Sequence, residues 1–385
     1  MIYLDNAATT FQKPEAVYRA VLQAMRQCAS PGRGGYAEAV RAEETVYRTR
    51  ALASELFSCQ PEQVCFTSCA TEGLNAAIRT LVRPGDRVVI SGLEHNAVTR
   101  TLHAVGAAPE VVTAPLFSPD DWAAAFDRAI TPGTAAVICT HVSNVFGAVL
   151  PIYRISRICA ERGVPLIVDA SQSAGILPVS LKRWRAAFVA MPGHKGLYGP
   201  QGTGLLLCGR QPDPLLFGGT GSSSADAQMP DFLPDRMEAG TRNVPGIAGL
   251  GAGLQYLQER NLSLDLQREQ QMISRMADGL VSLGADVYAG EAQAGVLSFR
   301  IPDTDPVEAA GQLADSGIAV RAGLHCAPLA HRTAGTFPDG TIRVSVSSLT
   351  VPQAAEVFLR RMGGLFLKKP GAGREKPCYF SKNHV

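Results

Sequence analysis

The chain has 385 residues, of which 46% are hydrophobic and 18% charged. This is the composition of a globular protein with room for two domains, and it excludes a disordered or fibrous chain. The net charge of +2 argues against a nucleic-acid-binding protein, which needs a basic excess. The sequence contains neither an apolar stretch that would span a membrane nor a secretion signal after Met1, so we expect a cytoplasmic protein with no membrane partner.

The nine cysteines are odd in number and scattered along the chain, unlike the dense sets of secreted disulfide scaffolds. We expect most of them to be small buried hydrophobic residues. Cys65 and Cys69 are close in sequence, but no second pair lies nearby to complete a zinc site. The sequence therefore predicts no metal.

Helical and strand patterns alternate through the first 210 residues. One helix is expected to begin at Pro14 and another to cover 38–57. The first helix has an apolar face made of Val17, Val21, Ala24 and Met25. Continuous apolar runs, typical of buried strands, lie at 63–67, 87–91, 135–141, 164–169, 186–190 and 204–208. Apolar strands separated by helices predict an α/β fold around a mostly parallel sheet that is covered on both faces.

The second half of the chain changes in character. Residues 211–243 are rich in Gly, Pro and Ser and predict a long loop, and a long helix follows from about 245 towards 283, broken near Asn261. A small α+β unit is expected next, with strands at 296–300, 318–321 and 341–345, a helix at 306–315 and a closing helix from Pro352. We therefore predict a large domain at 1–245, a small domain at 246–367 and an extension at 368–385.

Two charged residues are expected at the ends of strands, where open parallel sheets bind ligands. Asp169 closes the run 164–169, and burial of its carboxylate requires a cation. Lys195 follows the next strand in a Gly-His-Lys-Gly turn and could form a Schiff base. Pyridoxal phosphate needs both groups, a carboxylate for its ring nitrogen and an amine for its aldehyde. Taken singly, a salt bridge and a surface lysine are the simpler interpretations, but their placement together favours the cofactor.

Other strand ends carry residues that suit the rest of this cofactor. Thr71 and backbone N–H groups at the start of a helix form an anion site, although a Thr there can equally be an ordinary helix cap. His95 follows the strand 87–91 and could cover a flat ring, although a core histidine is the alternative. Asn144 and Gln172 lie just past strand ends and could donate a hydrogen bond to the ring oxygen.

A series of short motifs carries a family resemblance. They are YLDNAA at 3–8, ATEGLN at 70–75, EH at 94–95, HVSN at 141–144, VDASQ at 168–172, GHK at 193–195, EAGTRN at 238–243, RAGLHC at 321–326 and GTIR at 340–343. Together they resemble the class V branch of fold-type I pyridoxal-phosphate enzymes, most closely the cysteine desulfurase and selenocysteine lyase group. The resemblance runs from residue 3 to about residue 362. It implies a large domain built on a mostly parallel sheet of the seven-stranded type. It also implies a smaller α+β domain, near which residues 1–30 pack.

The resemblance also assigns a role to individual residues. It makes Lys195 the Schiff-base lysine, Asp169 the partner of the ring nitrogen and His95 the stacking group. The phosphate would be held by Ala70, Thr71 and His194, and the phenolic oxygen by Gln172. Thr241 would reach the phosphate of a neighbouring subunit, which implies a homodimer. The substrate carboxylate would be bound by Asn144, Arg321 and Arg343, since the arginine fork suits carboxylates.

Cys326 separates a desulfurase from a transaminase. In the resemblance its thiol attacks the sulfur of the substrate and carries it as a persulfide. It follows His325 and lies five residues after Arg321 in a Gly-containing loop, where positive charge favours the reactive thiolate. An isolated cysteine would more simply be a buried structural thiol. The short interval after Arg321 resembles the subgroup that holds the cysteine near the cofactor.

The reaction implied is removal of sulfur from L-cysteine, which gives L-alanine and a Cys326 persulfide. Lys195 would move the proton at Cα, and the sulfur would pass to an acceptor protein or a small thiol. The alternatives are a selenocysteine lyase, acting on L-selenocysteine, and a β-eliminating or epimerising relative. A chain that kept the fold as an inactive scaffold or sulfur carrier is the alternative from another class.

Four positions depart from the pattern of the family. Pro192 stands where a serine is usual, Tyr36 where a histidine often lies near the substrate, and Leu324 where a histidine is common before the cysteine. Thr350 replaces an asparagine before the last helix, which we interpret as one helix cap in place of another. In the tail, Cys378 is expected to be an incidental thiol, and the alternative is a relay for sulfur.

Overall fold

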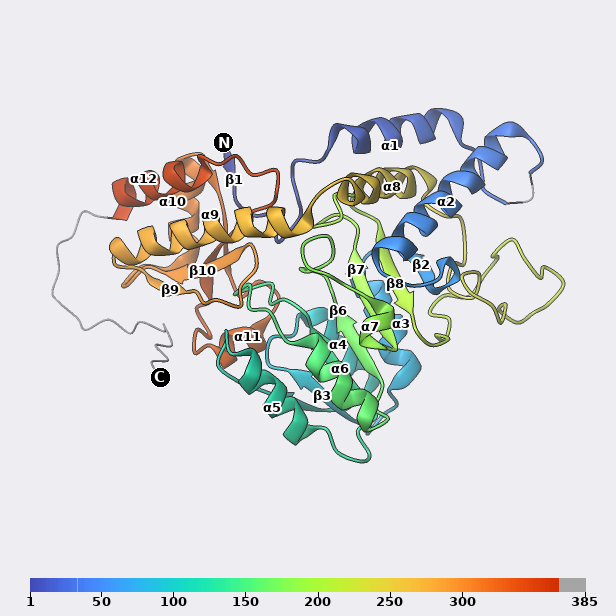
Figure 1. Ribbon diagram of the computed structural model, residues 1–385, viewed down its shortest axis with the longest axis horizontal. Helices are drawn as coiled ribbons and strands as arrows, with labels where there is room; N and C mark the ends of the chain where they lie inside the picture. Colours follow the sequence, from blue (N-terminus) through green and yellow to red (C-terminus); the bar gives the residue numbers. More distant parts are fainter. Residues whose placement is uncertain (33, 367–385) are drawn as a thin grey trace.

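The computed structural model describes residues 1–32 and 34–366, which form a seven-stranded, a four-stranded and a two-stranded sheet (Figure 1). Cys378 and the rest of the predicted extension lie outside the described residues. The larger sheet has seven strands in the order β2-β8-β7-β6-β5-β3-β4. They are β2 (Val64–Thr67), β3 (Arg87–Ser91), β4 (Ala108–Val112), β5 (Ala136–Thr140), β6 (Leu166–Asp169), β7 (Phe188–Pro192) and β8 (Gly204–Cys208). Strand β8 runs antiparallel to both of its neighbours, β2 and β7, and the other four strand pairs are parallel, so the predicted mostly parallel sheet is confirmed.

Strand β4 was missed because it lacks an apolar run. It lies at the edge of the sheet, contains Pro109 and exposes four of its five residues. An edge strand packs on few neighbours, so its sequence has no continuous stretch of buried side chains to reveal it.

Helices cover both faces of the large sheet, and successive residues of its central strands enter different cores. Val88 and Ile90 of β3 pack with α3 (Ala70–Leu81) and α4 (Asn96–Val105). Val89, between them, packs on the opposite face. The helices of that face are α2 (Ala37–Leu56), α5 (Pro119–Ala129), α6 (Ile152–Glu161), α7 (Leu181–Trp184) and α8 (Val244–Gln258). Burial on both faces explains the uninterrupted apolar runs.

The smaller sheet is antiparallel, in the order β12-β13-β10-β9. Its strands are β9 (Asp286–Tyr288), β10 (Val296–Arg300), β12 (Arg321–Gly323) and β13 (Thr341–Ser345). The helices of this half are α9 (Leu262–Ser282), α10 (Pro306–Asp315) and α12 (Ala354–Phe366), whereas α11 (Pro328–Thr333) buries Ala330 in the core of the large sheet. Strand β1 (Ile2–Tyr3) pairs with β11 (Ile318–Ala319), and Leu4 is buried in the core of this half. The first residues of the chain thus belong structurally with its last third.

The packing of α8 and α9 bears on the domain boundary. Helix α8 lies between α1 (Glu15–Gln27) and α2 and buries Leu250 and Leu254 in the core of the large sheet (Figure 1). Helix α9 packs against α12 and the small sheet instead, and the Asn261 side chain caps its N-terminus by accepting from the Leu264 N–H. We therefore propose that the boundary lies between the two helices rather than at residues 245 and 246.

Two local predictions were wrong. Met25 is 68% exposed and does not belong to the buried face of helix α1, where Val17 and Ala24 are buried and Val21 is half-buried against Gly249 of α8. Thr350 does not cap α12, which begins at Ala354. Its Oγ1 accepts from the Ser347 N–H and closes a turn.

Residues 209–243 contain no helix or strand, as expected for a long loop. No helix within 1–32 and 34–366 has the length and apolar character needed to cross a bilayer.

Candidate active site

A cavity of about 220 Å³ lies where the carboxyl ends of the large sheet meet the small half. Every predicted site residue except Thr241 lines it. These residues are Ala70, Thr71, His95, Asn144, Asp169, Gln172, His194, Lys195, Arg321, Cys326 and Arg343. Thr241 is exposed in the loop 209–243 and lies outside the cavity wall. The sequence motifs, which are spread over more than 250 residues, thus converge on one site.

Lys195 stands in a tight turn after β7. A Cβ atom on Gly193 would lie 2.2 Å from Thr203 Oγ1, and one on Gly196 would lie 2.3 Å from the Ala174 carbonyl oxygen. These contacts explain why glycines flank the His-Lys pair, because side chains there would displace the turn. Within the described residues, the Lys195 Nζ has no hydrogen-bond partner. The amine is therefore free to react with a ligand.

Burial is the main cause that lowers the Lys195 pKa from 10.5 to about 8, and the positive charges of Arg343 and Arg321 lower it further. The negative charge of Asp169 acts in the opposite direction. A lysine with this pKa has a substantial fraction of neutral, nucleophilic amine near neutral pH.

Asp169 is the last residue of β6 and lies between β5 and β7. It is only 3% exposed, and its Oδ1 accepts from the Ser171 N–H at 2.9 Å. The other oxygen, Oδ2, meets no donor in the part of the chain that the structure describes. This carboxylate can therefore bind one further donor inside the cavity.

The N-terminus of α3 forms another wall. Cys69 is the N-cap residue and its side chain caps nothing, so the first N–H groups of this helix are available to an anion. Thr71 lies within the first turn, which rules out the interpretation of Thr71 as the helix cap. The His194 Nδ1 is 3.0 Å from Thr9 Oγ1, and burial with the nearby Lys195 and Lys13 lowers the His194 pKa to about 4.

His95 and Gln172 are each held by one hydrogen bond. His95 is the N-cap of α4, and its Nδ1 accepts from the Ala97 N–H at 3.0 Å, which fixes the ring orientation. Burial lowers the His95 pKa, so the ring is neutral. The Gln172 Nε2 donates to the Ala7 carbonyl at 2.9 Å and has a second hydrogen for a ligand.

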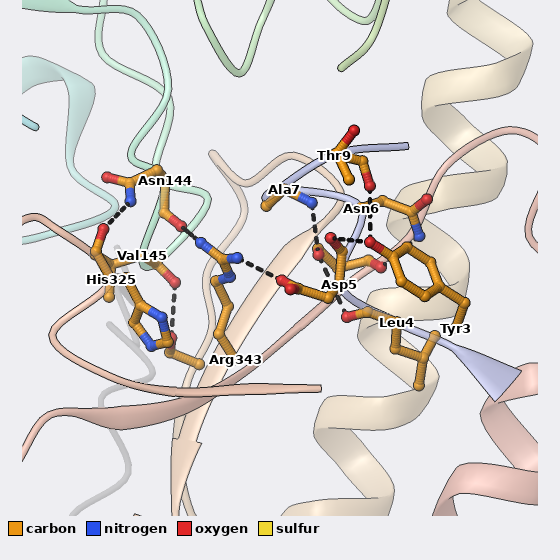
Figure 2. A network of polar contacts seen from close by, with 12 residues as sticks. Tyr3, Leu4, Asp5, Asn6, Ala7, Thr9, Asn144, Val145, His325 and Arg343 are labelled. Carbon is orange, nitrogen blue, oxygen red and sulfur yellow. Dashed lines mark hydrogen bonds and ion pairs between the residues drawn. The ribbon is translucent and has the colours of Figure 1, made fainter. Parts of the chain in front are cut away.

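Arg343 joins the two halves of the protein (Figure 2). Its Nη1 donates to the Asn144 carbonyl at 2.8 Å and its Nη2 to Asp5 Oδ1 at 2.6 Å. Burial lowers the Arg343 pKa, and the buried Nε has no partner among the described residues. Arg321 lies opposite Arg343 on the adjacent strand, is exposed and forms no ion pair within 1–32 and 34–366.

Cys326 is exposed at the cavity wall, in a turn with unusual backbone geometry. His325 and Cys326 have φ angles of +48° and +57°, in the left-handed region that non-glycine residues rarely adopt. Three hydrogen bonds hold the turn. The Asn144 Nδ2 donates to the His325 carbonyl at 2.8 Å, the Asn96 N–H donates to the Cys326 carbonyl at 2.7 Å, and the His325 Nε2 lies 3.1 Å from the Thr341 carbonyl.

The sequence-based argument gave no role to Asp5, His325 or Glu94, although all three lie within the quoted motifs. Glu94 is fully buried between two strand ends, and its Oε1 accepts from the Thr140 N–H at 2.7 Å. Burial raises the Glu94 pKa to about 8. Two of these residues could have been identified from the sequence: Glu94 is a carboxylate directly before His95, and Asp5 is a carboxylate inside the motif at 3–8.

The departures from the family pattern lie at different distances from the cavity. Pro192 lines it, whereas Leu324 does not and Tyr36 is 55% exposed elsewhere. No cluster of three His, Cys, Asp or Glu side chains suited to a metal ion occurs in the described part of the chain.

The groups left free in this cavity match those of pyridoxal phosphate. A free lysine amine suits its aldehyde, a buried carboxylate oxygen suits its ring nitrogen, and an uncapped helix N-terminus suits its phosphate. The fold and the cavity together define a pyridoxal-phosphate enzyme of fold type I.

The chain belongs to the aminotransferase class-V family, whose sequence profile matches residues 2–356. A probable cysteine desulfurase of Methanothermobacter thermautotrophicus is 32% identical over 360 residues, 90% of each chain. A cysteine desulfurase of Escherichia coli O157:H7 is 31% identical over 346 residues, which cover 85% of this chain and 84% of the relative. The apo structure of a cysteine desulfurase from Thermococcus onnurineus NA1 has a TM-score of 0.87 and 29% identity, over 95% of this chain and 94% of that one.

Proposed function

We propose that this protein is a pyridoxal-phosphate-dependent cysteine desulfurase. In the reaction, a thiol on the enzyme takes the sulfur of L-cysteine, and the products are L-alanine and an enzyme persulfide. The observation that carries the proposal is that Cys326 lines the same cavity as Lys195 and Asp169. Relatives named as cysteine desulfurases, which align over most of the chain, support the same activity.

Each part of the cofactor has a matching group in the cavity. Lys195 would hold the aldehyde, Asp169 the ring nitrogen and Gln172 the phenolic oxygen, with His95 against the ring face. The phosphate would be held by Ala70, Thr71 and His194. When bound, the cofactor supplies an aldehyde that condenses with amines and a ring that accepts electron density from Cα.

Lys195 is also the proposed proton carrier. Its lowered pKa, to about 8, leaves neutral amine to take a proton from the substrate Cα and return it later. Burial makes the protonated form of the Lys195 amine unfavourable, and the positive charges of Arg343 and Arg321 disfavour it further. The cavity thus supports acid–base work at Nζ near neutral pH.

Three residues are proposed to bind the substrate carboxylate. Arg321 has no competing ion-pair partner within the described ranges, and Arg343 retains N–H groups beyond those given to Asp5 and Asn144. Asn144 has one amide hydrogen left after its bond to the His325 carbonyl. These donors line the same cavity as Cys326, and we propose that they orient the sulfur of the substrate towards its thiol.

The Cys326 thiolate is proposed to attack the sulfur of the substrate. A bond forms between the two sulfur atoms, the Cβ–S bond breaks, and its electron pair stays with the carbon skeleton, which is protonated to alanine. Because Cys326 is exposed, its persulfide would be open to an acceptor protein or a small thiol.

A homodimer is proposed from two surface features. Thr241 is exposed, and the loop that carries it is anchored by the buried Glu238, which forms a bidentate ion pair with Arg50. Helix α1 exposes Leu22 and Met25 beside a groove that a second subunit could cover. Such a dimer would allow Thr241 to reach the phosphate of the neighbouring subunit.

A cytoplasmic location is proposed from the state of the cysteines. All eight in the described ranges are free thiols, including Cys65 and Cys208, whose sulfur atoms are 3.8 Å apart. Unpaired thiols in this number suit a reducing compartment.

The test is to incubate the holoenzyme with L-cysteine and a reducing thiol, and to measure alanine and sulfide. We expect equal amounts of both, and little product from other amino acids. Pyruvate and ammonia in place of alanine would identify a β-eliminating lyase. Selenide release from L-selenocysteine without turnover of L-cysteine would identify a selenocysteine lyase.

A further inference from the structure

The turn that carries Cys326 is held in a strained conformation. Two successive non-glycine residues, His325 and Cys326, have positive φ angles. A non-glycine residue in this region is strained, and the conformation persists only where the surroundings hold it. The hydrogen bonds to this turn are therefore what keeps the thiol at the cavity wall.

The side-chain bond to this turn from the large half comes from Asn144. Its Nδ2 donates to the His325 carbonyl at 2.8 Å, while its own backbone carbonyl accepts from Arg343 Nη1 at 2.8 Å. Asn144 therefore links the guanidinium to the turn (Figure 2). A shift of Arg343 would therefore move Asn144, whose side chain holds the His325 carbonyl.

Arg343 in turn depends on Asp5. The arginine side chain is only 2% exposed, and Asp5 is its one ion-pair partner in the described part of the chain. A buried guanidinium without a counterion is strongly unfavourable. Arg321 lies directly across the strand pair, so the charge of Asp5 also offsets the repulsion between the two arginines.

The position of Asp5 is itself fixed by the segment around it. The Tyr3 hydroxyl bonds to the carbonyls of Asp5 at 3.1 Å and of Thr9 at 2.9 Å (Figure 2). The Ala7 N–H donates to Ser345 Oγ at 2.8 Å, and the Ser345 N–H donates to the Leu4 carbonyl at 2.7 Å. The N-terminal segment is thus tied to β13, the strand that carries Arg343.

We propose that Asp5 is a positioning residue for the sulfur-accepting thiol: through Arg343 and Asn144 it holds the strained turn of Cys326. This inference rests on the proposed function only for the role of Cys326. It makes the carboxylate site and the nucleophile one connected unit, so that the arginine proposed to bind the substrate also sets the place of the thiol that attacks it.

The test measures amide hydrogen exchange in the resting holoenzyme, which requires no turnover. The Asn96 N–H is the reporter, because it donates to the Cys326 carbonyl. In Asp5→Asn the charge is lost at constant shape, and we expect Asn96 to exchange roughly tenfold faster, the change that one weakened hydrogen bond produces. Amides of the central strand β5 should exchange as in the wild type, whereas a general loss of stability would accelerate both.

Two further variants sharpen the result. Asp339→Asn is the matched control, since it removes another Asp–Arg ion pair, with Arg300, on the same small sheet, and it should leave Asn96 unchanged. Asn144→Ala should accelerate Asn96 exchange, and adding Asp5→Asn to it should have no further effect, because both act along one chain of contacts. Additive effects, or an unchanged Asn96 in Asp5→Asn, would overturn the proposal.

Asp5→Glu keeps the proposal testable if Asp5→Asn does not fold. It keeps the carboxylate but moves it by one methylene, and we expect a smaller acceleration at Asn96 than in Asp5→Asn; an acceleration as large as in Asp5→Asn would count against the carboxylate as the positioning group. The proposed activity is tested separately by alanine formation. A holoenzyme inactive on cysteine would refute the desulfurase and leave the exchange result to decide the role of Asp5.

Discussion

The lowered pKa of Lys195 makes a quantitative prediction about how the apoenzyme captures its cofactor. Only the neutral amine attacks the aldehyde of pyridoxal phosphate. With a pKa of about 8, in place of 10.5, roughly one lysine in ten is neutral at pH 7, compared with about three in ten thousand for an ordinary lysine. Capture at neutral pH should therefore be on the order of 300-fold faster than an exposed lysine would allow.

The assay follows the absorbance change when excess pyridoxal phosphate is mixed with apoenzyme at a series of pH values. The rate should rise with pH, since deprotonation creates the nucleophile, and reach half of its maximum near pH 8. In Arg321→Ala the midpoint should move to higher pH, because Arg321 is one of the positive charges that lower the Lys195 pKa. A wild-type midpoint near 10.5, or a midpoint that moves to lower pH in Arg321→Ala, would refute this account of the lysine environment.

Three further predictions concern the proposed roles. Lys195→Ala should abolish turnover and the borohydride-reducible link to the cofactor; a reducible adduct in this variant would exclude Lys195 as the site of attachment. Cys326→Ser should keep the cofactor and lose turnover of cysteine, yet retain some activity on selenocysteine, whose carbon–selenium bond is weaker; undiminished desulfuration would remove Cys326 from the mechanism. Truncation after Leu367 should leave sulfur transfer to an external thiol unchanged, and a loss would favour the alternative in which the tail with Cys378 relays sulfur.

The sequence predicted those parts of the fold that have strong local signals. Strands β5 and β6 are buried on both faces, so their apolar runs are visible without any knowledge of the fold. The edge strand β4 has no such signal. The boundary that we propose between α8 and α9 differs from the one predicted at residue 245, because the packing of α8 on α1 and α2 is tertiary and leaves no local signal in the sequence.

The candidate site was predictable as a set of residues, but its connections were not. Asp169 and Lys195 could be paired from their places at strand ends, and the cavity brings them together. The ion pair of Asp5 with Arg343 joins residues 338 positions apart, and no local pattern predicts such a contact. The strained turn at Cys326 was equally hidden, since positive φ angles are expected at glycine and not at His325.

Mass spectrometry of the holoenzyme after one addition of L-cysteine tests the central claim most directly. The peptide that contains Cys326 should gain the mass of one sulfur atom, a reducing thiol should remove it, and one alanine should form for each persulfide. Alanine formed with no added sulfur on Cys326, or with the sulfur on Cys69, which also lines the cavity, would contradict Cys326 as the sulfur acceptor.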